Sequence, residues 1–318
     1  MRLDTSLMDK ATTARQLHQA RETRETRHAH SVHQPYPPRL AEPAAQPERR
    51  VRQDWQLAVS WADNAAQVRE AQALRYRVFV LEMGARLTPP TGTAPNLDAD
   101  RFDPFCDHLL VYASQGGRRT GTRLVGTYRL LSPASARAAG GFYMDTEFDL
   151  APLVALRAHA VELGRSCVDP AWRSGAVIMM LWSALGDYMR THRLQTMIGC
   201  ASIPLKANLH DVASLWQELR QTHLASPQWQ VQPHVGLSAE QNATTRDAPI
   251  PGWPYPAAAS AVESGRLALP PLIKGYLRCG ARLLGPPALD LDFNTADLPM
   301  MLQVEDLVPR YRRHFLAQ

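Results

Sequence analysis

Runs of apolar residues, some alternating with polar ones, predict a series of strands along the chain. Side chains of a strand alternate between its two faces, and a strand that is buried on both faces is apolar throughout. These runs are bounded by polar residues, Gly and Pro, as strands usually are. The predicted strands cover residues 55–61, 108–112, 124–131, 160–168 and 196–201.

Apolar residues at helical spacing predict helices between these strands. The first helix carries one stripe of five apolar residues from Val68 to Leu81. A second helix begins near Gly175 and a third covers about 212–224. Three further segments are predicted: a short acidic helix at 145–156, a helix or turn leading into a strand at 270–284, and ordered residues at 289–293.

This order of elements predicts one mixed α/β domain over residues 51–318, because strands and helices do not alternate strictly as in a doubly wound sheet. The chain has 318 residues, of which 45% are hydrophobic, and can bury a sizeable core. Residues 226–268 are rich in Pro, Ala, Gln and Ser, and they predict an irregular insertion or lid.

Residues 1–50 carry many Arg and His residues but little apolar periodicity, and they predict a disordered basic arm. His28, His30 and His33 are the metal-ligand candidates of this arm. Three His residues without supporting carboxylates are more often incidental, and no metal is predicted. The four cysteines lie far apart and form no C-x-x-C pair, which argues against a zinc site or a disulfide framework.

The formal net charge of +5 favours an acidic partner, which includes nucleic acid, an anionic membrane surface and an acidic protein. Charge alone does not choose among them. The sequence shows no apolar run as long as a membrane span and no signal-peptide core, so we expect an intracellular protein.

An acid and a base interrupt the apolar strand 160–168. Glu162 and Arg165 are three residues apart and would point to opposite faces of a regular strand. Gly164 permits a bulge, which shifts the register by one residue and would bring both charges to one face. Bulges are common beside active sites, and this pair is a candidate site. The alternative is an edge strand with both charges in solvent.

Past this strand, Arg173, Ser174 and Gly175 stand where the second helix begins. Unpaired N–H groups and the helix dipole make such a helix end an anion site, to which Arg173 and Ser174 add donors. A strand, a turn and a helix N-terminus together predict a holder for a phosphate-bearing group. The alternative is that Ser174 only caps the helix.

Several motifs resemble the GNAT acyltransferase superfamily, and within it the branch that takes acyl groups from acyl carrier protein. Arg75 to Phe79 resembles an R-x-x-V-F motif, Arg129 begins an R-L-L strand motif, and Glu162 with Arg165 resembles E-x-x-R. Asp103 to His108 resembles the acidic approach to a strand. Residues 272–281 and 292–297 are similar to the L-ornithine Nα-acyltransferases, and the acyl-homoserine-lactone synthases lack them.

The resemblance implies a GNAT-like mixed central sheet with a splayed, bulged strand. It implies transfer of a 3-hydroxyacyl group from acyl carrier protein to the α-amine of L-ornithine, giving lyso-ornithine lipid. The carrier's phosphopantetheine thioester is then a co-substrate, and no cofactor is expected. Residues 173–176 keep an Arg and a Gly without the full glycine spacing of the coenzyme A signature, which favours recognition of a single phosphate.

The same resemblance implies roles for individual residues. The catalytic candidates are Glu162, as general base or as the partner of an arginine, and Arg165. Asp103 or Asp107 would suit the δ-amine of ornithine, and the arginines its carboxylate. The remaining candidates are Arg75, Phe79 and Arg129 for substrate binding, and Val168, Arg173, Ser174 and Gly175 for the phosphopantetheine.

Acyl carrier proteins are acidic, so docking to one fits the positive charge, and the basic arm would hold a cytoplasmic enzyme at the anionic inner membrane surface. Nucleic acid is not expected as a partner. Two alternatives stay open. One is an enzyme that acylates another amino acid or makes a lactone, and the other is a non-catalytic membrane- or nucleic-acid-binding module on the same fold.

Overall fold

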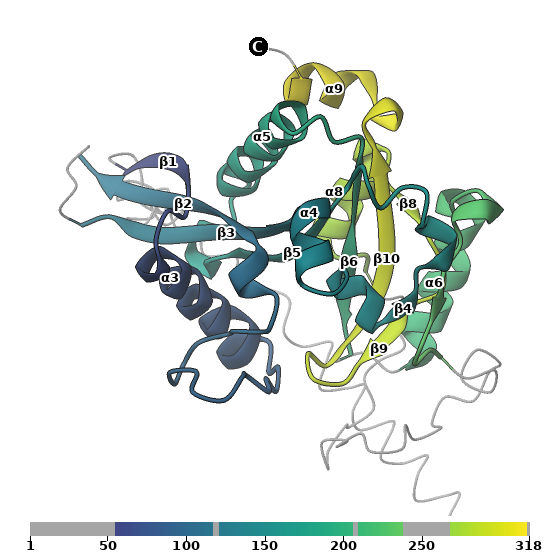
Figure 1. The fold of residues 1–318 in the computed structure, drawn as a ribbon, viewed down its shortest axis with the longest axis horizontal. Coiled ribbons are helices and arrows are strands. Elements are labelled where there is room, and N and C mark those ends of the chain that lie inside the picture. Colours follow the sequence, from purple (N-terminus) through teal and green to yellow (C-terminus); the bar gives the residue numbers. More distant parts are fainter. Residues whose placement is uncertain (1–54, 117–120, 206–208, 238–267, 317–318) are drawn as a thin grey trace, which may run out of the picture. The chain divides into compact units, whose positions relative to one another are not determined.

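A computed structural model describes residues 55–116, 121–205, 209–237 and 268–316. The predicted basic arm and the main part of the predicted insertion, 238–267, lie outside these residues. Most of the strands join in one sheet with the order β1-β2-β3-β5-β6-β10-β8, and β9 pairs with β10 (Figure 1). The strands are β1 (Trp55–Trp61), β2 (Asp107–Gln115), β3 (Arg123–Leu131), β5 (Ala160–Val168), β6 (Thr196–Pro204), β8 (Arg282–Leu283), β9 (Ala288–Asp290) and β10 (Thr295–Gln303).

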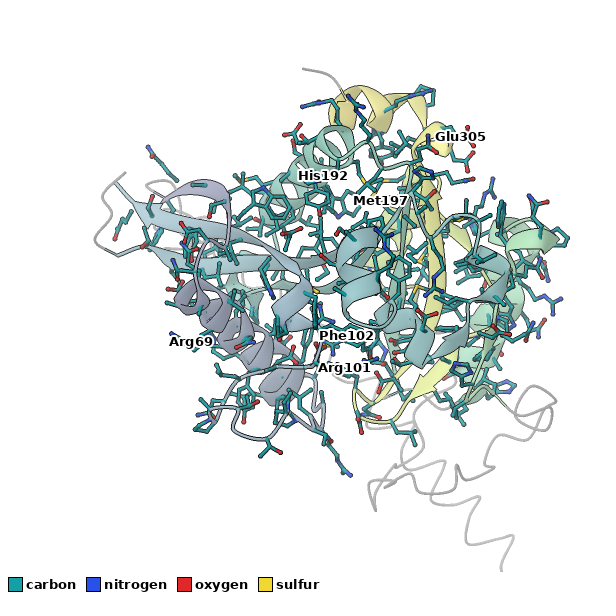
Figure 2. The ribbon with its side chains drawn as sticks, in the orientation of Figure 1. Arg69, Arg101, Phe102, His192, Met197 and Glu305 are labelled. Atoms are coloured by element: carbon teal, nitrogen blue, oxygen red, sulfur yellow. The ribbon has the colours of Figure 1, made fainter. Side chains whose placement is uncertain are left out.

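Helices cover both faces of this sheet, which explains why its middle strands are mostly apolar. The helices are α3 (Ala65–Arg75), α4 (Pro133–Ala138), α5 (Ala176–Thr191), α6 (Leu209–His223), α8 (Pro271–Cys279) and α9 (Pro309–Leu316). Leu110 of β2 packs in the core below α3, whereas its neighbours Leu109 and Val111 pack in the core below α5. Met197 belongs to the α5 core and Phe102 to a separate core cluster (Figure 2).

Strands β5 and β6 pair in parallel over only three residues. Residues 160–162 of β5 pair with residues 196–198 of β6, and the pairing stops there. A Cβ atom on Gly199 would lie 2.3 Å from the Leu163 carbonyl oxygen, so only glycine allows this close approach. Beyond it the two strands separate and leave an opening in the middle of the sheet.

The first helix changes form at Arg75, and this corrects part of the predicted stripe. Residues Tyr76–Glu82 form a π-helix, which has more residues per turn than an α-helix. The wider turn rotates later residues away from the stripe, so Val78 is buried but Leu81 is 69% exposed. π-Helical turns are frequent at functional sites.

The predicted acidic helix at 145–156 is wrong. Tyr143–Thr146 and Ala151–Leu153 are 3₁₀ turns, and between them lies β4 (Phe148–Asp149), which pairs with β7 (Gln232–Pro233). The acidic side chains bind backbone N–H groups locally: Asp145 accepts from Phe142 and Asp149 from Ala151. Such bonds compete with a helix.

The sequence pattern missed strands β7 and β10 and helices α4 and α9 (Pro309–Leu316). Strand β10 contains Pro299 and the buried Asp297, which interrupt its apolar run. Helix α4 is short but has its signals in place, because Ser132 caps it and Pro133 is its first residue. In the residues with described structure, no helix has both the length and the apolar character to cross a membrane.

Candidate active site

The predicted bulge in β5 is confirmed, one residue later than predicted. Arg129 of β3 stands opposite Gly164, and Thr127 stands opposite Cys167, so β5 has one extra residue between these pairs. Arg165 itself takes the left-handed conformation, with φ 52°. A left-handed non-glycine residue is costly and gathers at functional sites. The bulge turns Arg165 toward the face of the sheet that carries Arg129 and Glu162.

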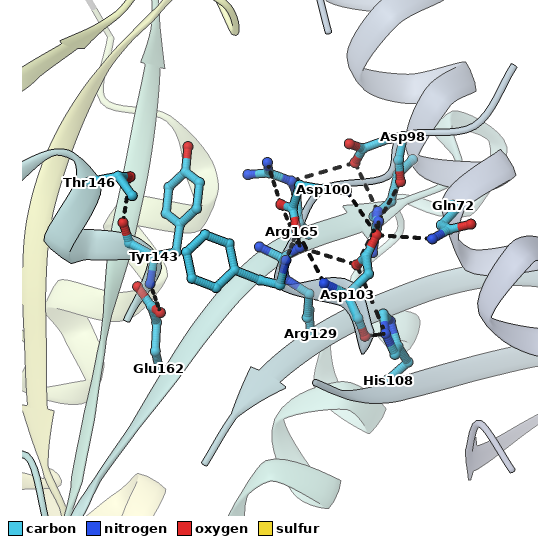
Figure 3. Close-up of polar contacts among 12 residues, drawn as sticks. Gln72, Asp98, Asp100, Asp103, His108, Arg129, Tyr143, Thr146, Glu162 and Arg165 are labelled. Carbon is cyan, nitrogen blue, oxygen red and sulfur yellow. Dashed lines mark hydrogen bonds and ion pairs between the residues drawn. The ribbon is translucent and has the colours of Figure 1, made fainter. Parts of the chain in front are cut away.

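Arg165 is part of an arginine–aspartate network that ties three elements to the loop after the π-helix (Figure 3). Each arginine comes from a different element, namely α3, β3 or β5, and the three aspartates come from the loop before β2. The network is balanced, with as many acids as bases. Its members are Arg75, Arg129, Arg165, Asp98, Asp100 and Asp103.

Arg75 is fully buried and is occupied by this network. Its Nε lies 2.8 Å from Asp98 Oδ2 and its Nη2 lies 2.8 Å from Asp103 Oδ2. Asp103 also accepts a hydrogen bond from Gln72 Nε2 at 3.0 Å. Burial acts to raise the pKa of Asp103, but the guanidiniums of Arg75 and Arg129 lower it well below the usual range. Arg75 and Asp103 thus hold the loop in place and do not face open space.

Asp100 joins the other two arginines. Both of its carboxylate oxygens lie 2.7 Å from Nη1 of Arg129, and Oδ2 lies 3.1 Å from Nη2 of Arg165. The Arg165 guanidinium lies between two rings, 5.0 Å from the centroid of Tyr143 and 4.3 Å from that of Phe293. Phe79 of the π-helix packs edge-to-face on Phe293. Arg165 is therefore held rigidly by ion pairs and ring contacts.

Glu162 lies beside this network and anchors the first 3₁₀ turn. Its Oε2 accepts from the Tyr143 N–H at 2.6 Å and its Oε1 from the Met144 N–H at 2.7 Å (Figure 3). The side chain is buried. Burial raises its pKa to about 7, although these two backbone hydrogen bonds and Arg129 act to lower it. A carboxyl with such a pKa exchanges its proton near neutral pH.

A group of three acidic residues, which the sequence analysis did not identify, lies across Tyr143 from Arg165. We call Glu147, Asp290 and Asp297 the carboxylate cluster. The Tyr143 hydroxyl donates to Asp290 Oδ2 at 3.4 Å, and the Cys200 thiol donates to Glu147 Oε2 at 3.3 Å. Within the described part of the chain, none of the three carboxylates forms an ion pair with Lys or Arg, and the buried Oε1 of Glu147 has no hydrogen-bond partner.

The carboxylates of this cluster repel one another. Burial, followed by repulsion from Asp297 and Asp290, raises the pKa of Glu147 to about 9. Burial and Asp290 raise the pKa of Asp297 to about 6. Ligand atoms of Glu147, Cys200 and Asp297 all lie within 4.8 Å of one another, close enough to hold a metal ion. The cluster thus has the chemistry of a site for a cation.

The opening between β5 and β6 contains an apolar cavity that adjoins the carboxylate cluster. About 590 Å³ of this region is free of protein atoms, part of it open to solvent. Cys200 belongs to both sites, because it lines the cavity and contacts Glu147. Two tyrosines bring the only hydroxyl groups to the described wall. The wall consists of Tyr128, Leu163, Trp182, Leu185, residues 197–201, Tyr276, Cys279, Ala281 and residues 300–302.

The residues of the predicted phosphate holder lie at the start of α5, where the Arg173 guanidinium is paired with Glu82. Gly175 caps this helix with φ 98°, so the helix begins where predicted and Ser174 is not its cap. Arg173 donates from Nε to the Val168 carbonyl at 3.2 Å and forms two hydrogen bonds with Glu82, at 2.6 and 2.8 Å.

The structure does not bring Asp107 to any of these sites, because Asp107 accepts from the Tyr188 hydroxyl at 2.7 Å.

The carboxylate cluster gave a weak signal in the sequence. Asp297 lies in the segment 292–297, which carries part of the family resemblance. Glu147 lies in a segment that was interpreted as an acidic helix, where a glutamate is expected to face solvent. Only the antiparallel pairing of β6 with β10 brings Cys200 and Asp297 near each other.

Comparisons with known proteins identify the family of the chain. Residues 74–183 match the acetyltransferase (GNAT) domain model. The L-ornithine Nα-acyltransferase of Agrobacterium fabrum is 37% identical over 262 residues, which cover 81% of this chain and 85% of that protein. The protein of the same name from Brucella abortus is 35% identical, over 82% of this chain and 89% of its own length. The chain is therefore an acyltransferase of the GNAT fold and belongs to the L-ornithine Nα-acyltransferase family.

Proposed function

We propose that the protein transfers a 3-hydroxyacyl group from an acyl carrier protein to the α-amine of L-ornithine and so makes lyso-ornithine lipid. One observation carries the proposal: an apolar cavity adjoins, at Cys200, a carboxylate cluster that has no Lys or Arg partner among the described residues. A fatty acyl chain suits the cavity, and a diamino acid suits the cluster. The names of the relatives support ornithine as the amine.

The acyl donor would enter through the opening between β5 and β6. Its chain would fill the apolar cavity, and its phosphate would lie at the start of α5, near Val168, Ser174 and Gly175. A thioester is already activated, so its reaction with an amine needs no protein nucleophile. The thiols fit this view, since burial raises the pKa of Cys200 well above its usual value and that of Cys167 to about 12. They are poor nucleophiles at neutral pH.

Ornithine carries two ammonium groups, and the carboxylate cluster would bind the δ-ammonium. A cation placed among Glu147, Asp290 and Asp297 removes their mutual repulsion and satisfies the free Oε1 of Glu147. The α-carboxylate of ornithine would then pair with Arg165, which lies across Tyr143 from the cluster. The α-amine would thus be held at the mouth of the cavity.

Purified protein should be assayed with 3-hydroxytetradecanoyl acyl carrier protein and L-ornithine, with mass spectrometry of the product. We expect N-(3-hydroxytetradecanoyl)-ornithine. Lysine, homoserine and S-adenosylmethionine serve as competing amines in the same mixture. A product from one of these amines, with none from ornithine, would overturn the proposed acceptor, and transfer from the coenzyme A thioester alone would overturn the proposed donor.

Glu162 is the proposed proton acceptor for the α-ammonium, directly or through water. Only the ionised form of Glu162 can act as a base, so kcat/KM should rise as pH increases through about 7, the pKa of the buried carboxyl. In Glu162→Gln this limb of the pH profile should disappear and the rate should fall by about 10²–10⁴-fold.

The Gln variant needs a stability control, because an amide cannot accept both backbone hydrogen bonds that Glu162 accepts from Tyr143 and Met144. A lower melting temperature with the pH limb retained would mean that Glu162 only anchors the turn. Asp145→Asn is a matched control, since Asp145 holds the same turn through the Phe142 N–H. It should lower stability without removing the limb.

The basic arm 1–50 is proposed to hold the enzyme at an anionic membrane surface, where its lipid product partitions. Vesicles containing phosphatidylglycerol should retain the full-length protein at low salt and release it at high salt, because salt screens the attraction. Vesicles of phosphatidylcholine should retain little. Equal retention by both would argue against a role for charge.

A further inference from the structure

We propose that the hydroxyl groups of Tyr128 and Tyr276 bind an oxygen substituent on the acyl chain and so select 3-hydroxyacyl donors over unsubstituted ones. This inference rests on the proposed function, because it assigns a specificity role within the same cavity. The hydroxyls lie 2.7 Å apart, and both rings line the cavity whose other walls are mainly apolar.

The tyrosine pair is fixed in place from two elements. Tyr128 belongs to β3 and is buried, and Tyr276 belongs to α8 and stacks on Trp182 with ring centroids 5.6 Å apart. A Cβ atom on Gly275 would lie 2.8 Å from the Trp182 ring, so glycine lets α8 approach that ring. Burial raises the pKa of Tyr276 to about 12, so this phenol keeps its proton. The pair is thus a neutral and rigid polar group.

The pair has room for one more hydrogen bond. A phenol oxygen donates one hydrogen bond and accepts up to two. Tyr276 interacts with both Tyr128 and the Ser166 hydroxyl, whereas Tyr276 is the one hydrogen-bond partner of the Tyr128 hydroxyl among the residues described. Whichever phenol donates, the Tyr128 oxygen keeps an unused lone pair. A hydroxyl group on a ligand chain can use it.

The position of the pair fits a substituent near the thioester. Tyr128 lies between Thr127 and Arg129, so it stands opposite the bulge of β5. Ser166, which reaches Tyr276, is the residue next to Arg165. The pair therefore lies at the level of the proposed reaction centre along β5. An oxygen on the third carbon, rather than one at the chain end, is the expected ligand.

The expected selectivity is moderate, since the two phenols can bond to each other when an unsubstituted chain is bound. A site whose polar groups are left wholly unpaired can reject the wrong substrate by about 10⁴–10⁵-fold. Here one neutral hydrogen bond is gained or lost, which amounts to about tenfold. Wild-type enzyme should therefore prefer 3-hydroxytetradecanoyl over tetradecanoyl acyl carrier protein by about tenfold in kcat/KM.

The test compares this preference in Tyr128→Phe, Tyr276→Phe and a matched control, Tyr112→Phe. The Tyr112 hydroxyl bonds to Glu70 on the surface, away from the cavity. Each variant is assayed with both donors and L-ornithine, and its melting temperature is measured. We expect the preference to fall to about one in Tyr128→Phe and Tyr276→Phe and to persist in Tyr112→Phe.

The outcomes separate this inference from the proposed function. If wild-type enzyme acylates ornithine equally well from both donors, or if both tyrosine variants keep the preference, the inference is wrong and the proposed function stands. If wild-type enzyme acylates no ornithine from either donor, the proposed function fails. If Tyr276→Phe does not fold, Tyr128→Phe decides, because it removes the oxygen with the unused lone pair.

Discussion

Asp297→Asn should lower kcat/KM for L-ornithine by about 100-fold and yet leave the protein at least as stable as wild type. The loss follows because truncating one partner of a buried charge pair costs several kcal/mol of binding. The gain in stability follows because Asp297 and its neighbours repel one another when no cation is bound; burial and then this repulsion raise the pKa of Glu147. Initial rates measure the expected loss in kcat/KM, and melting temperatures measure the expected stability.

Asp292→Asn is the matched control for this prediction. Asp292 is an exposed acid five residues before Asp297, and its backbone carbonyl, which the substitution keeps, accepts from Arg86. Its rate with ornithine should match wild type. An unchanged rate in Asp297→Asn would remove the carboxylate cluster from ornithine binding. A metal ion that copurifies with wild type, but not with Asp297→Asn, would assign the cluster to metal binding.

Arg75→Ala should destabilise the domain by about 3–5 kcal/mol, because it removes from two buried aspartates one of the two arginines that each of them contacts. Arg75 is fully buried and contacts both Asp98 and Asp103. For a domain of this size, such a loss lowers the melting temperature by roughly 10 °C. Thermal unfolding and urea unfolding both measure it.

Arg77→Ala is the control for Arg75→Ala, because Arg77 lies two residues later, is exposed, and bonds only to the Ala73 carbonyl within the described residues. It should change stability by less than about 0.5 kcal/mol. Similar losses in both variants would mean that the network adds little. Arg75→Lys should recover only part of the stability, since an ammonium cannot reproduce the forked contacts of a guanidinium.

The sequence predicts the region around β5 well, because its signals are local. The bulge, the pair Glu162 and Arg165, and the helix that begins after Gly175 lie within a few residues of one another. The exact position of the bulge was wrong by one residue, since a glycine usually takes the left-handed conformation and here Arg165 does. The contacts of Arg165 with Asp98 and Asp100 hold that conformation.

The carboxylate cluster could not be predicted from local pattern, because its members come from 3₁₀ and strand segments that are far apart in the chain. Strand β10 was itself missed, and without it Asp297 has no place beside Cys200 and Asp290 of β9 has no strand with which to pair. The aspartate partners of Arg75 could likewise not be predicted from local pattern. The motif that contains Arg75 indicated its importance, but Asp98 lies in a loop without a periodic signal.

The even balance of the arginine–aspartate network has an electrostatic consequence for the whole molecule. Because the positive and negative charges of the network cancel, the network adds little to the electrostatic potential at the site. The carboxylate cluster therefore makes the local potential negative. The chain as a whole carries +5. The protein therefore attracts anions from a distance and cations at close range. Salt screens the long-range field within about 10 Å and leaves the buried one nearly intact, so ionic strength acts on encounter with an acidic partner more than on selection of the amine.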